Sequence, residues 1–526
     1  MSTFVYGLRC QFVVVFLLFT QAAVAQATQG DVARGRVYVD SNMNEQLDAG
    51  EKLLPGIRIS NGNKIVETDA KGEFEIPISD DCIIFLIKPT GYRTPFSDQR
   101  TPEFYYIHKP NGSPASKFEG VKPTGPLPES IDFPLYPQEE PKVFRALMFG
   151  DPQPRNQKEI DYIAHDIVEE LVGTDAALGV TLGDILFDDL SLFESQGRTI
   201  GLLGIPWYNV IGNHDINLDA SERRYANETF EKHYGPSYYS FDYGQVHFLV
   251  LDDIDWIVPE EGQSGRPRYQ AGLGKEQLEF IRNDLEGVSD EKLVVLLMHI
   301  PITQIKDRQD LFRLIENRPF CMSISGHTHH HEHRYLKKAD GWQGATPHHH
   351  VINVTVSGSW WSGNVNEWGI PHATMADGAP NGYSILSFDG SEYRVEYRAA
   401  GRSEKYQMNI TAPEEVKLSE LDEVEIYANI FNGSERTSVV FRVGGMSRWM
   451  EMSRTVEKDP GYIQAFERDS KATERLSPRM SAPKASTHLW KAKLPSKLGA
   501  GPQLIHVRST DPNGQTHDGY RVIRVK

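Results

Sequence analysis

The apolar residues of this chain follow two periodicities that divide it into three parts. Residues 32–137 and 408–526 contain short alternating or wholly apolar runs separated by Gly, Asn, Asp and Pro, which predicts strands joined by turns, without helices. Residues 143–401 instead alternate apolar runs with amphipathic stretches. The pattern predicts a multidomain protein with a central α/β domain and a β-sandwich on either side.

The central part contains the clearest helix signals. In residues 160–171 and 274–288, apolar side chains recur at i, i+3 and i+4, which is typical of a helix with one buried face. Apolar runs such as 143–149 and 293–298 predict buried strands. Residues 134–141 are rich in proline and charge, which favours an extended linker before this domain.

The first 25 residues have the pattern of a secretory signal peptide. Arg9 precedes an apolar run at 12–19, and the run ends near Ala23-Val24-Ala25, an A-x-A cleavage pattern. Thr20 and Gln21 interrupt the run before it reaches the ~20 apolar residues that a membrane anchor needs. We expect cleavage after Ala25, no membrane span in the mature chain, and a secreted or periplasmic location.

Length and charge narrow the classes of function. The chain has 526 residues, and at roughly 100 to 200 residues per domain this length predicts three or four domains. Its 55 Lys and Arg against 72 Asp and Glu give a net charge of −17, so nucleic acid is not an expected partner. The hydrophobic content of 39% argues against a disordered chain and against a polytopic membrane protein.

Side chains that bind metals follow five of the predicted central strands. In chain order they are Asp151 and Gln153; Asp184; Asn213, with His214 and Asp215 next to it; His299; and His327 and His329. Loops at the carboxyl ends of strands form the ligand crevice of α/β sheets, so these segments could converge on one site. Their carboxylates, amide oxygens and imidazoles fit two closely spaced divalent ions, with one Asp bridging both.

In this order the motifs resemble those of the calcineurin-like metallophosphoesterases, namely D-x-H, G-D-x-x-x-D, G-N-H-D or G-N-H-E, a single His after a strand, and G-H-x-H. The chain has Asp151-Pro152-Gln153, Gly183-Asp184-Ile185-Leu186-Phe187-Asp188, Gly212-Asn213-His214-Asp215, His299 and Gly326-His327-Thr328-His329. The resemblance spans about residues 143–400, and secreted members of the family have similar flanking β domains. It implies a four-layer α/β core.

The resemblance also implies a ligand set. Asp151, Asp184 and His329 would hold a first divalent ion, and Asp184 would bridge to a second. Asn213, His299 and His327 would complete the second ion, and the metals would be Mn, Fe or Zn.

Gln153 departs from the family pattern, which has a His at this position. A carboxamide can coordinate through its oxygen but is a poorer donor than imidazole for Zn²⁺ or Fe. The first ion could therefore bind weakly, or the site could favour Mn²⁺. A degenerate, inactive site is the alternative.

Two ions about 3.5 to 4 Å apart would lower the pKa of a bridging water, so that a hydroxide attacks a phosphate mono- or diester in line. His214 would protonate the leaving oxygen or stabilise the charge on phosphorus, and Asp215 could orient its imidazole. Asp188 matches the family signature but could equally make structural hydrogen bonds. His330, His331 and His333, and the cluster His348 to His350, are expected to be mostly solvated or to support ligands.

Candidate substrate contacts lie near the metal motifs. Trp360, Trp361, His372 and Asp377 belong to a long irregular segment that could wall the site or could be a packed loop. Arg155 could pair with the substrate phosphate or be a solvated surface residue. We expect the substrate to be a small-molecule phosphate ester or a surface polymer.

An acidic loop in the first domain has the oxygen spacing of a Ca²⁺ site. Asp40, Asn42, Asn44, Gln46, Asp48 and Glu51 fall at positions 1, 3, 5, 7, 9 and 12 of an EF-hand-like count. Glu45 stands where that loop needs Gly, and flanking helices are not predicted, so a polar turn is the alternative.

The leading hypothesis is an extracytoplasmic two-metal phosphoesterase. A non-catalytic surface-binding protein with structural metals is the alternative, and a nuclease is disfavoured by the net acidity. The sequence leaves the oligomeric state open.

Overall fold

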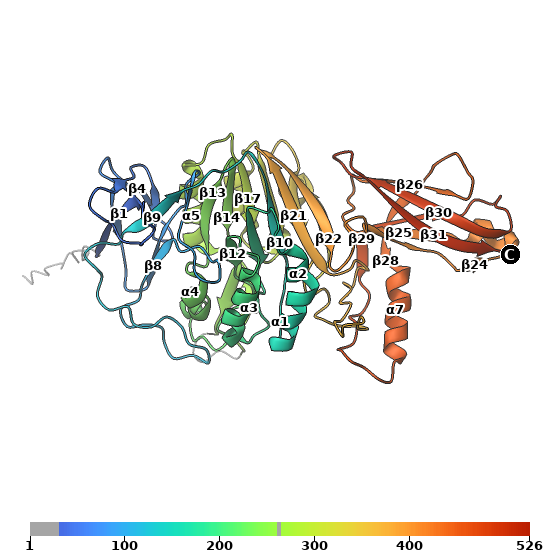
Figure 1. The fold of residues 1–526 in the computed structure, drawn as a ribbon, viewed down its shortest axis with the longest axis horizontal. Coiled ribbons are helices and arrows are strands. Elements are labelled where there is room, and N and C mark those ends of the chain that lie inside the picture. Colours follow the sequence, from blue (N-terminus) through green and yellow to red (C-terminus); the bar gives the residue numbers. More distant parts are fainter. Residues whose placement is uncertain (1–30, 260–264) are drawn as a thin grey trace, which may run out of the picture.

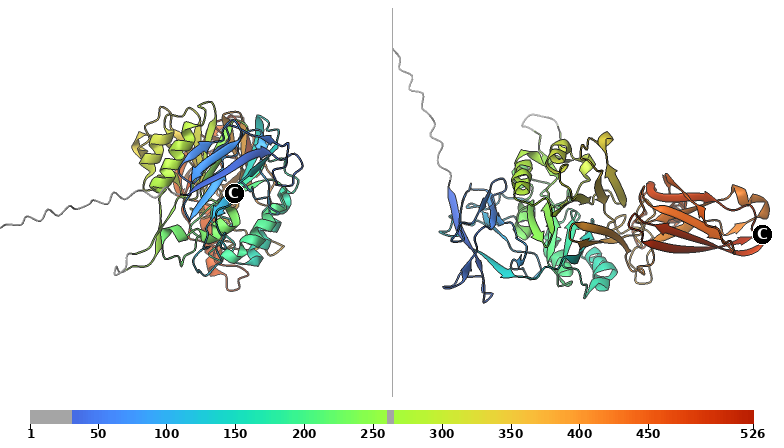
Figure 2. Two further views of the ribbon diagram at one scale, coloured as in Figure 1. Left: turned by 90° about the vertical axis from the view of Figure 1, so that its left-hand side faces the viewer. Right: turned by 90° about the horizontal axis from the view of Figure 1, so that it is seen from above.

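The computed structural model describes residues 31–259 and 265–526, and these form three domains in a row (Figure 1). The N-terminal domain and the C-terminal domain lie at opposite ends of the central domain in Figure 1 and in the right-hand view of Figure 2. The signal peptide predicted at residues 1–25 lies outside the described residues. Within the described ranges, no helix is long and apolar enough to cross a membrane.

The N-terminal domain is a sandwich of two small sheets around an apolar core. One sheet has the order β2-β1-β9-β7, with β5 also paired to β1, and the other has the order β4-β3-β6-β8. The strands are β1 (Val32–Val39), β2 (Lys52–Leu53), β3 (Arg58–Ser60), β4 (Ile65–Glu67), β5 (Glu73–Pro77), β6 (Cys82–Leu86), β7 (Tyr92–Arg93), β8 (Tyr105–His108) and β9 (Phe133–Pro137).

Strand β9 replaces the first half of the predicted linker at 134–141. It pairs in parallel with β1, and the carbonyl of Leu135 accepts the N–H of Asp40 at 3.2 Å. Phe133 and Leu135 fill the core of this domain, and their burial stabilises the pairing although Pro134 and Pro137 cannot donate to a ladder. The proline content therefore predicted a looser segment than the structure has.

The central domain contains two mixed sheets. The first has the order β12-β11-β10-β21-β22 and the second the order β13-β14-β17-β18-β20-β19. The strands are β10 (Val143–Phe149), β11 (Leu178–Leu182), β12 (Trp207–Val210), β13 (Tyr239–Tyr243), β14 (Val246–Val250), β17 (Leu293–Leu297), β18 (Cys321–Ser325), β19 (Glu332–Leu336), β20 (His348–Ile352), β21 (Gly382–Asp389) and β22 (Glu392–Ala399), with a separate hairpin of β15 (Ile254–Ile257) and β16 (Arg268–Ala271).

Helices cover the outer faces of these sheets. They are α1 (Gln157–Ile163), α2 (Glu169–Leu171), α3 (Phe193–Gly201), α4 (Glu228–Tyr234), α5 (Gly274–Glu286) and α6 (Arg308–Ile315). The predicted helix at 160–171 is one continuous helix in which a π-helical stretch, Ala164–Val168, joins α1 to α2. Asn156 caps its start by accepting the N–H of Glu159 at 3.2 Å.

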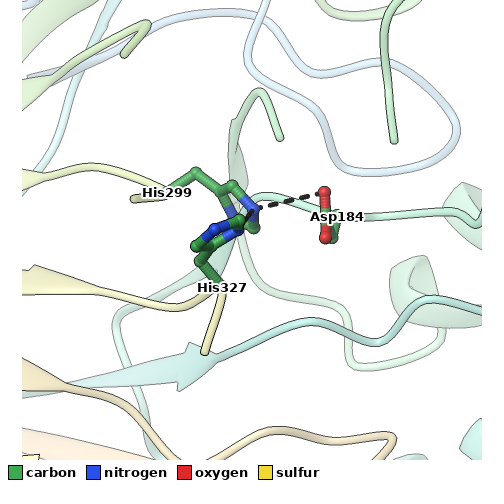
Figure 3. A group of neighbouring side chains, drawn as sticks. All are labelled: Asp184, His299 and His327. Atoms are coloured by element: carbon green, nitrogen blue, oxygen red, sulfur yellow. Dashed lines mark hydrogen bonds and ion pairs between the residues drawn. The ribbon is translucent and has the colours of Figure 1, made fainter. Parts of the chain in front are cut away.

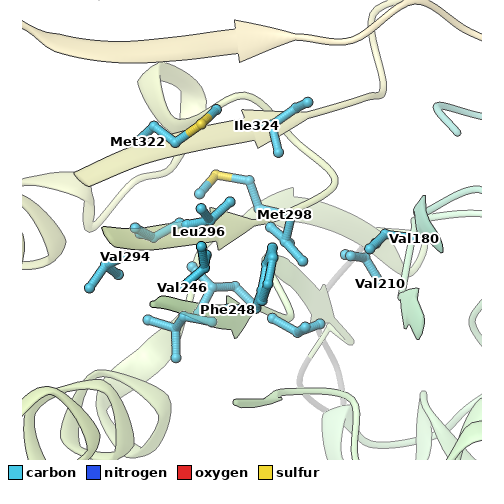
Figure 4. Packing of buried hydrophobic residues seen from close by; sticks show 14 of the residues in the cluster. Val180, Val210, Val246, Phe248, Val294, Leu296, Met298, Met322 and Ile324 are labelled. Atoms are coloured by element: carbon cyan, nitrogen blue, oxygen red, sulfur yellow. The ribbon is translucent and has the colours of Figure 1, made fainter. Parts of the chain in front are cut away.

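The main apolar core lies between the two sheets, as Figure 4 shows for side chains of both. Met148 and Val180 of the first sheet and Phe248 and Leu296 of the second are wholly buried. Each such side chain contributes about 1.5 to 3 kcal/mol through its removal from water. The two packed sheets hold the carboxyl ends of β10, β11, β12, β17 and β18 at one edge, where the predicted metal ligands follow.

The C-terminal domain is a second sandwich, with sheets β23-β25-β29-β28 and β24-β31-β30-β26-β27 around its own core. The prediction that it has no helix is wrong, because α7 (Pro460–Lys471) follows Asp459, whose carboxylate accepts the N–H of Tyr462 at 2.9 Å. The strands are β23 (Met408–Thr411), β24 (Glu415–Val416), β25 (Glu425–Ile430), β26 (Ser438–Val443), β27 (Met450–Glu451), β28 (Ser453–Lys458), β29 (Ala485–Lys493), β30 (Gly501–Thr510) and β31 (Thr516–Val525).

Candidate metal centre and active site

The predicted metal ligands lie on loops whose backbone is held in an uncommon conformation. Asp151, Gln153, Asp184, His327 and His329 all have positive φ angles, between 39° and 73°. Non-glycine residues adopt this left-handed region at a cost of about 1 to 3 kcal/mol each, and such strain is typical of functional sites. The backbone conformation that directs these five side chains therefore lowers the stability of the fold.

Two glycines allow the loops to approach one another. A Cβ on Gly212 would lie 2.0 Å from the backbone nitrogen of Asp184, and a Cβ on Gly183 would lie 2.4 Å from Nδ1 of His299. Gly183 also has a φ of 81°, which favours glycine. Any larger residue at either position would push apart two of the predicted ligands.

Four predicted ligands of the second ion meet in the structure. The ligand atoms of Asp184, His299 and His327 all lie within 4.8 Å of one another (Figure 3). Nε2 of His299 is 3.3 Å from Oδ1 of Asp184 and 3.1 Å from Nδ1 of His327. The side-chain oxygen of Asn213 is 3.1 Å from the same Nε2.

The predicted ligands of the first ion lie on the other side of Asp184. Nε2 of His329 is 3.6 Å from Oδ1 of Asp151, and Nε2 of Gln153 donates to Oδ2 of Asp184 at 2.9 Å. The side-chain amide oxygen of Gln153 is buried without a hydrogen-bond partner among the described residues. A buried amide oxygen without a partner is costly, and a cation bound there would satisfy it. The residues present therefore fit a divalent metal centre.

Two ligand histidines are oriented by backbone carbonyls. Nδ1 of His299 donates to the carbonyl of Leu182 at 2.9 Å, and Nδ1 of His329 donates to the carbonyl of Gly358 at 2.5 Å. These bonds leave Nε2 of each ring directed at the carboxylates. Support of this kind fixes the tautomer and direction of a metal-binding imidazole.

The electrostatics of the cluster also favour cations. Burial and the nearby charge of Asp184 raise the pKa of Asp151 well above its ordinary value. Burial alone would raise the pKa of Asp184 as well, but the adjacent His299 lowers it below its ordinary value. Two buried carboxylates this close cannot both ionise at low cost without positive charge between them. Burial lowers the pKa of His327 to about 3 and that of His329 to about 4, so both imidazoles are neutral and able to ligate.

His214 lies beside this cluster and is held by Asp188. Its backbone N–H donates to Oδ1 of Asp184 at 3.0 Å, and its Nδ1 is 2.7 Å from Oδ1 of Asp188. The ring of Phe187 stacks on the imidazole, with centroids 4.5 Å apart. Nε2 of His214 has no hydrogen-bond partner among the residues the structure describes.

The expected role of Asp215 in orienting His214 is wrong. The Asp215 carboxylate is buried and accepts the backbone N–H groups of Ile185, Leu186 and Gly212, at 3.1, 3.0 and 2.8 Å. It therefore fixes the loop that carries Asp184, while Asp188 takes the place beside the imidazole. The G-D-x-x-x-D spacing gave the signal for Asp188.

Asp253 is a site residue that the sequence patterns did not reveal. It follows β14 by three residues, and its carboxylate accepts the N–H of Ile300, next to His299, at 2.8 Å. Its other oxygen is buried without a partner within the described ranges. Burial, with the charge of Asp252, raises the pKa of Asp253 to about 8. The only sequence signal was an acidic pair after a predicted strand.

The candidate substrate contacts have different surroundings. Arg155 donates to the carbonyl of Trp360 at 2.6 Å and pairs with Glu159 at 2.9 Å. The indole of Trp360 is partly exposed and stacks on His329, with ring centroids 4.2 Å apart. Trp361 is fully buried and donates from its indole nitrogen to the carbonyl of Pro152 at 3.2 Å, so it anchors the segment and does not face a substrate.

Asp377 and His372 lie elsewhere in that segment. Asp377 is buried and pairs with His488 of the C-terminal domain at 3.0 Å, and it accepts the N–H of His331 at the same distance. It therefore joins two domains, because a buried carboxylate needs such partners, and is not a substrate contact. His372 is exposed, and its backbone N–H donates to the carbonyl of Asn364 at 2.8 Å.

The second histidine cluster is buried, contrary to expectation. His348 and His350 lie on β20, and both bind the hydroxyl of Ser323 at 2.8 Å. His333 contacts His349 at 2.9 Å in the same region. The alternation of β20 directs His348 and His350 to one face of the sheet, beside Ser323, and His349 to the other face, where its Nδ1 is 2.8 Å from the hydroxyl of Tyr393. Hydrogen bonds to these neighbours replace water.

The acidic loop of the N-terminal domain satisfies its own polar groups. The Asp40 carboxylate accepts the N–H groups of Met43 at 2.7 Å and Glu45 at 2.8 Å, and the side-chain amides of Asn42 and Asn44 donate to Asp48 at 2.8 and 2.9 Å. These bonds form an Asx-type turn. Binding of Ca²⁺ by this loop stays a prediction.

Comparison with known proteins identifies the family. Residues 144–331 match the family described as calcineurin-like phosphoesterase, residues 41–123 match its N-terminal companion domain, and residues 350–517 match its C-terminal companion domain. Among solved structures, the chain is similar to a purple acid phosphatase, PPD1, isolated from yellow lupin (Lupinus luteus) seeds, with 13% identity and a TM-score of 0.34 over 66% of this chain and 67% of that chain. No curated protein matches the chain.

The chain belongs to the calcineurin-like phosphoesterases and carries both companion domains of that family. The family predicted from the five motifs is thereby confirmed, as is a metallophosphoesterase core between two flanking domains. The protein is a hydrolase of phosphoric ester bonds, and the family implies a divalent metal cofactor.

Proposed function

We propose that this protein is an extracytoplasmic phosphoesterase that hydrolyses a phosphate mono- or diester at a centre of two divalent ions. The observation that carries the proposal is the meeting of Asp184, His299 and His327, whose ligand atoms lie within 4.8 Å of one another. These residues come from three separate strand ends, and no single stretch of sequence could place them together.

Each ion would have its own set of ligands. Asp151, His329 and the partnerless oxygen of Gln153 would hold the first ion, and Asn213, His299 and His327 would hold the second. Asp184, whose two oxygens face the two groups, would serve both. When bound, such ions neutralise phosphoryl charge and lower the pKa of water at the site.

His214 would supply the proton that the leaving oxygen needs. Burial alone would lower its pKa, but the hydrogen bond to Asp188 and the charge of Asp184 raise it above the ordinary value. A proton held at Nε2 can pass to the leaving oxygen, while Asp188 keeps the Nδ1 proton and the ring direction.

The proposed location depends on the first 25 residues of the sequence, and the proposed substrate on the net charge. An acidic chain of charge −17 can bind a phosphate ester locally when metal ions cancel the carboxylates of the site. A small phosphate ester or a surface polymer remains the proposed substrate, and nucleic acid is not expected.

A panel of phosphate mono- and diesters, assayed with the metal-free protein reloaded with Mn²⁺, Fe²⁺ or Zn²⁺, tests the proposal. We expect turnover of at least one ester class that depends on added metal, and its loss in Asp184→Asn with the fold retained. Metal binding without turnover of any ester would favour a surface-binding protein with structural metals. Fractionation of the native host, with detection of the mature N-terminus, tests the location.

A further inference from the structure

Two aromatic side chains from different segments of the chain stack on histidines of the site. Phe187 stacks on His214 with ring centroids 4.5 Å apart and an angle of 23° between planes. Trp360 stacks on His329 with centroids 4.2 Å apart and an angle of 29°. Both aromatic rings are partly exposed, so each presents apolar surface to solvent beside the metal ligands.

The backbone is strained where it presents Trp360. Trp360 and Trp361 have consecutive φ angles of 58° and 49°, a left-handed conformation that bulky residues rarely adopt. Arg155 grips the carbonyl of Trp360 at 2.6 Å, and the buried indole of Trp361 is tied to Pro152. The left-handed backbone and these two hydrogen bonds place the indole of Trp361 in the interior and the indole of Trp360 beside His329.

Phe187 is similarly exposed by its loop. The preceding residues Ile185 and Leu186 are buried in an apolar cluster, whereas Phe187 turns out of it onto His214. Asp188, with a φ of 61°, then turns the chain so that its carboxylate reaches the same imidazole. A third ring, Tyr269 of β16, is 38% exposed and meets His327 edge-on with centroids 6.2 Å apart.

The charged side chain that is hydrogen-bonded to Trp360 is already paired. Arg155 donates to the carbonyl of Trp360 and is paired with Glu159, so it is not free to bind a phosphoryl oxygen. Beside the ions, the surface therefore offers ring faces to the organic part of an ester.

We propose that Phe187 and Trp360 form a subsite for the organic group of the ester, and that this subsite selects a phosphoester whose group contains a flat aromatic ring. This proposal rests on the proposed phosphoesterase function. Offset stacking on an aromatic side chain is worth about 0.5 to 1.5 kcal/mol beyond the burial of area, which corresponds to a factor of about 2 to 13 in affinity for each ring.

Three phosphonates distinguish binding of the organic group at this subsite from binding of the phosphonate group to the metals. Methyl-, cyclohexyl- and phenylphosphonate carry the same metal-binding head and are not hydrolysed, so inhibition constants against a chromogenic ester report binding alone. In the metal-loaded wild-type protein we expect phenylphosphonate to bind about tenfold more tightly than methylphosphonate, with cyclohexylphosphonate between them. Equal binding of the cyclohexyl and phenyl compounds would overturn the preference for a flat ring.

Variants then assign the preference to the two residues. Phe187→Ala and Trp360→Ala should each reduce the phenyl-to-methyl preference severalfold while leaving the methylphosphonate constant and the bound metal within about twofold. Trp360→Phe should restore most of the preference, because it keeps a ring. Trp368→Ala is the matched control, since this indole lies in the same segment but is 76% exposed.

Failure of the aromatic subsite and failure of the proposed phosphoesterase function give different results. An unchanged preference in both alanine variants would overturn the subsite while leaving the phosphoesterase function intact. Absence of metal-dependent turnover in the wild-type protein would instead refute the proposed function itself. Loss of metal or of methylphosphonate binding in Trp360→Ala would show that the ring only supports His329, and would also overturn the subsite.

Discussion

A buried histidine far from the candidate active site should control how stability depends on pH. His247 of β14 is inaccessible to solvent and lies between two carboxylates: its Nδ1 is 2.8 Å from Asp242 and its Nε2 is 2.7 Å from Asp284. Arg58 of the N-terminal domain pairs with Asp284 at 2.9 Å, and Lys292 pairs with Asp242 at 2.6 Å. The network therefore also joins two domains.

The size of the effect follows from the pKa of His247. Burial alone would lower this pKa, but the two carboxylates raise it to about 9. The unfolded chain has a pKa near 6.5, and the difference between the two states is worth about 3 kcal/mol of folding free energy. Because the folded pKa is the higher one, this contribution is complete below pH 6.5, declines between pH 6.5 and 9, and is lost above pH 9.

Urea unfolding of the wild-type protein and of His247→Gln between pH 6.5 and 9.5 measures this contribution. The transition of the central domain is followed, because three domains need not unfold in one step. We expect the wild-type protein to be the more stable at pH 6.5 and its advantage to shrink by about 3 kcal/mol toward pH 9.5. A constant difference in unfolding free energy across this range would refute the reasoning.

Three further predictions concern the domain junction and the metal centre. His488→Leu leaves Asp377 charged and buried without its partner, so calorimetry should show a loss of about 3 to 5 kcal/mol; an unchanged melting profile would contradict the pairing. Gly212→Ala should release bound metal on dialysis, since its Cβ would lie 2.0 Å from Asp184, whereas Gly445→Ala, with open space around it, should not; equal metal content in both would count against the crowding. Gln153→His should raise Zn²⁺ affinity about tenfold or more in chelator competition, because imidazole is the better donor, and a lower affinity would place Gln153 outside the ligand set.

Much of the central fold follows from local patterns. The apolar runs at 143–149 and 293–298 became the buried strands β10 and β17, and the spacing at 160–171 marked one continuous helix. These predictions hold because burial in a two-sheet core selects the same residues that the pattern singles out (Figure 4).

Other elements depend on contacts that a local pattern does not contain. Strand β9 forms despite two prolines because Phe133 and Leu135 reach the sandwich core beside β1. The histidines at 348–350 were expected to be solvated or to support ligands, and exposure to solvent is wrong because the side chains of Ser323 and Tyr393 lie against their rings. Helix α7 begins at a local pattern, an Asp cap followed by Pro, that the prediction of strands alone for residues 408–526 did not include.

The candidate site also has features that the sequence predicted and features that it did not. Motif order was enough to name the residues that converge, since strand ends meet at one edge of an α/β sheet. It was not enough to assign hydrogen-bond partners: Asp188 and not Asp215 holds His214, and Asp377 pairs with a histidine of another domain. Such partners depend on how loops from separate strands fold over one another.

The central claim is that Asp184 joins two divalent ions in a hydrolytic centre, and metal counting combined with turnover tests it most directly. Metal-free wild-type protein and Asp184→Asn are titrated with Mn²⁺, and bound metal per chain and phosphate-ester hydrolysis are measured on the same samples. We predict that wild-type activity appears as the second ion binds and that Asp184→Asn is inactive. Full wild-type activity with one ion, or undiminished turnover in Asp184→Asn, would contradict the account.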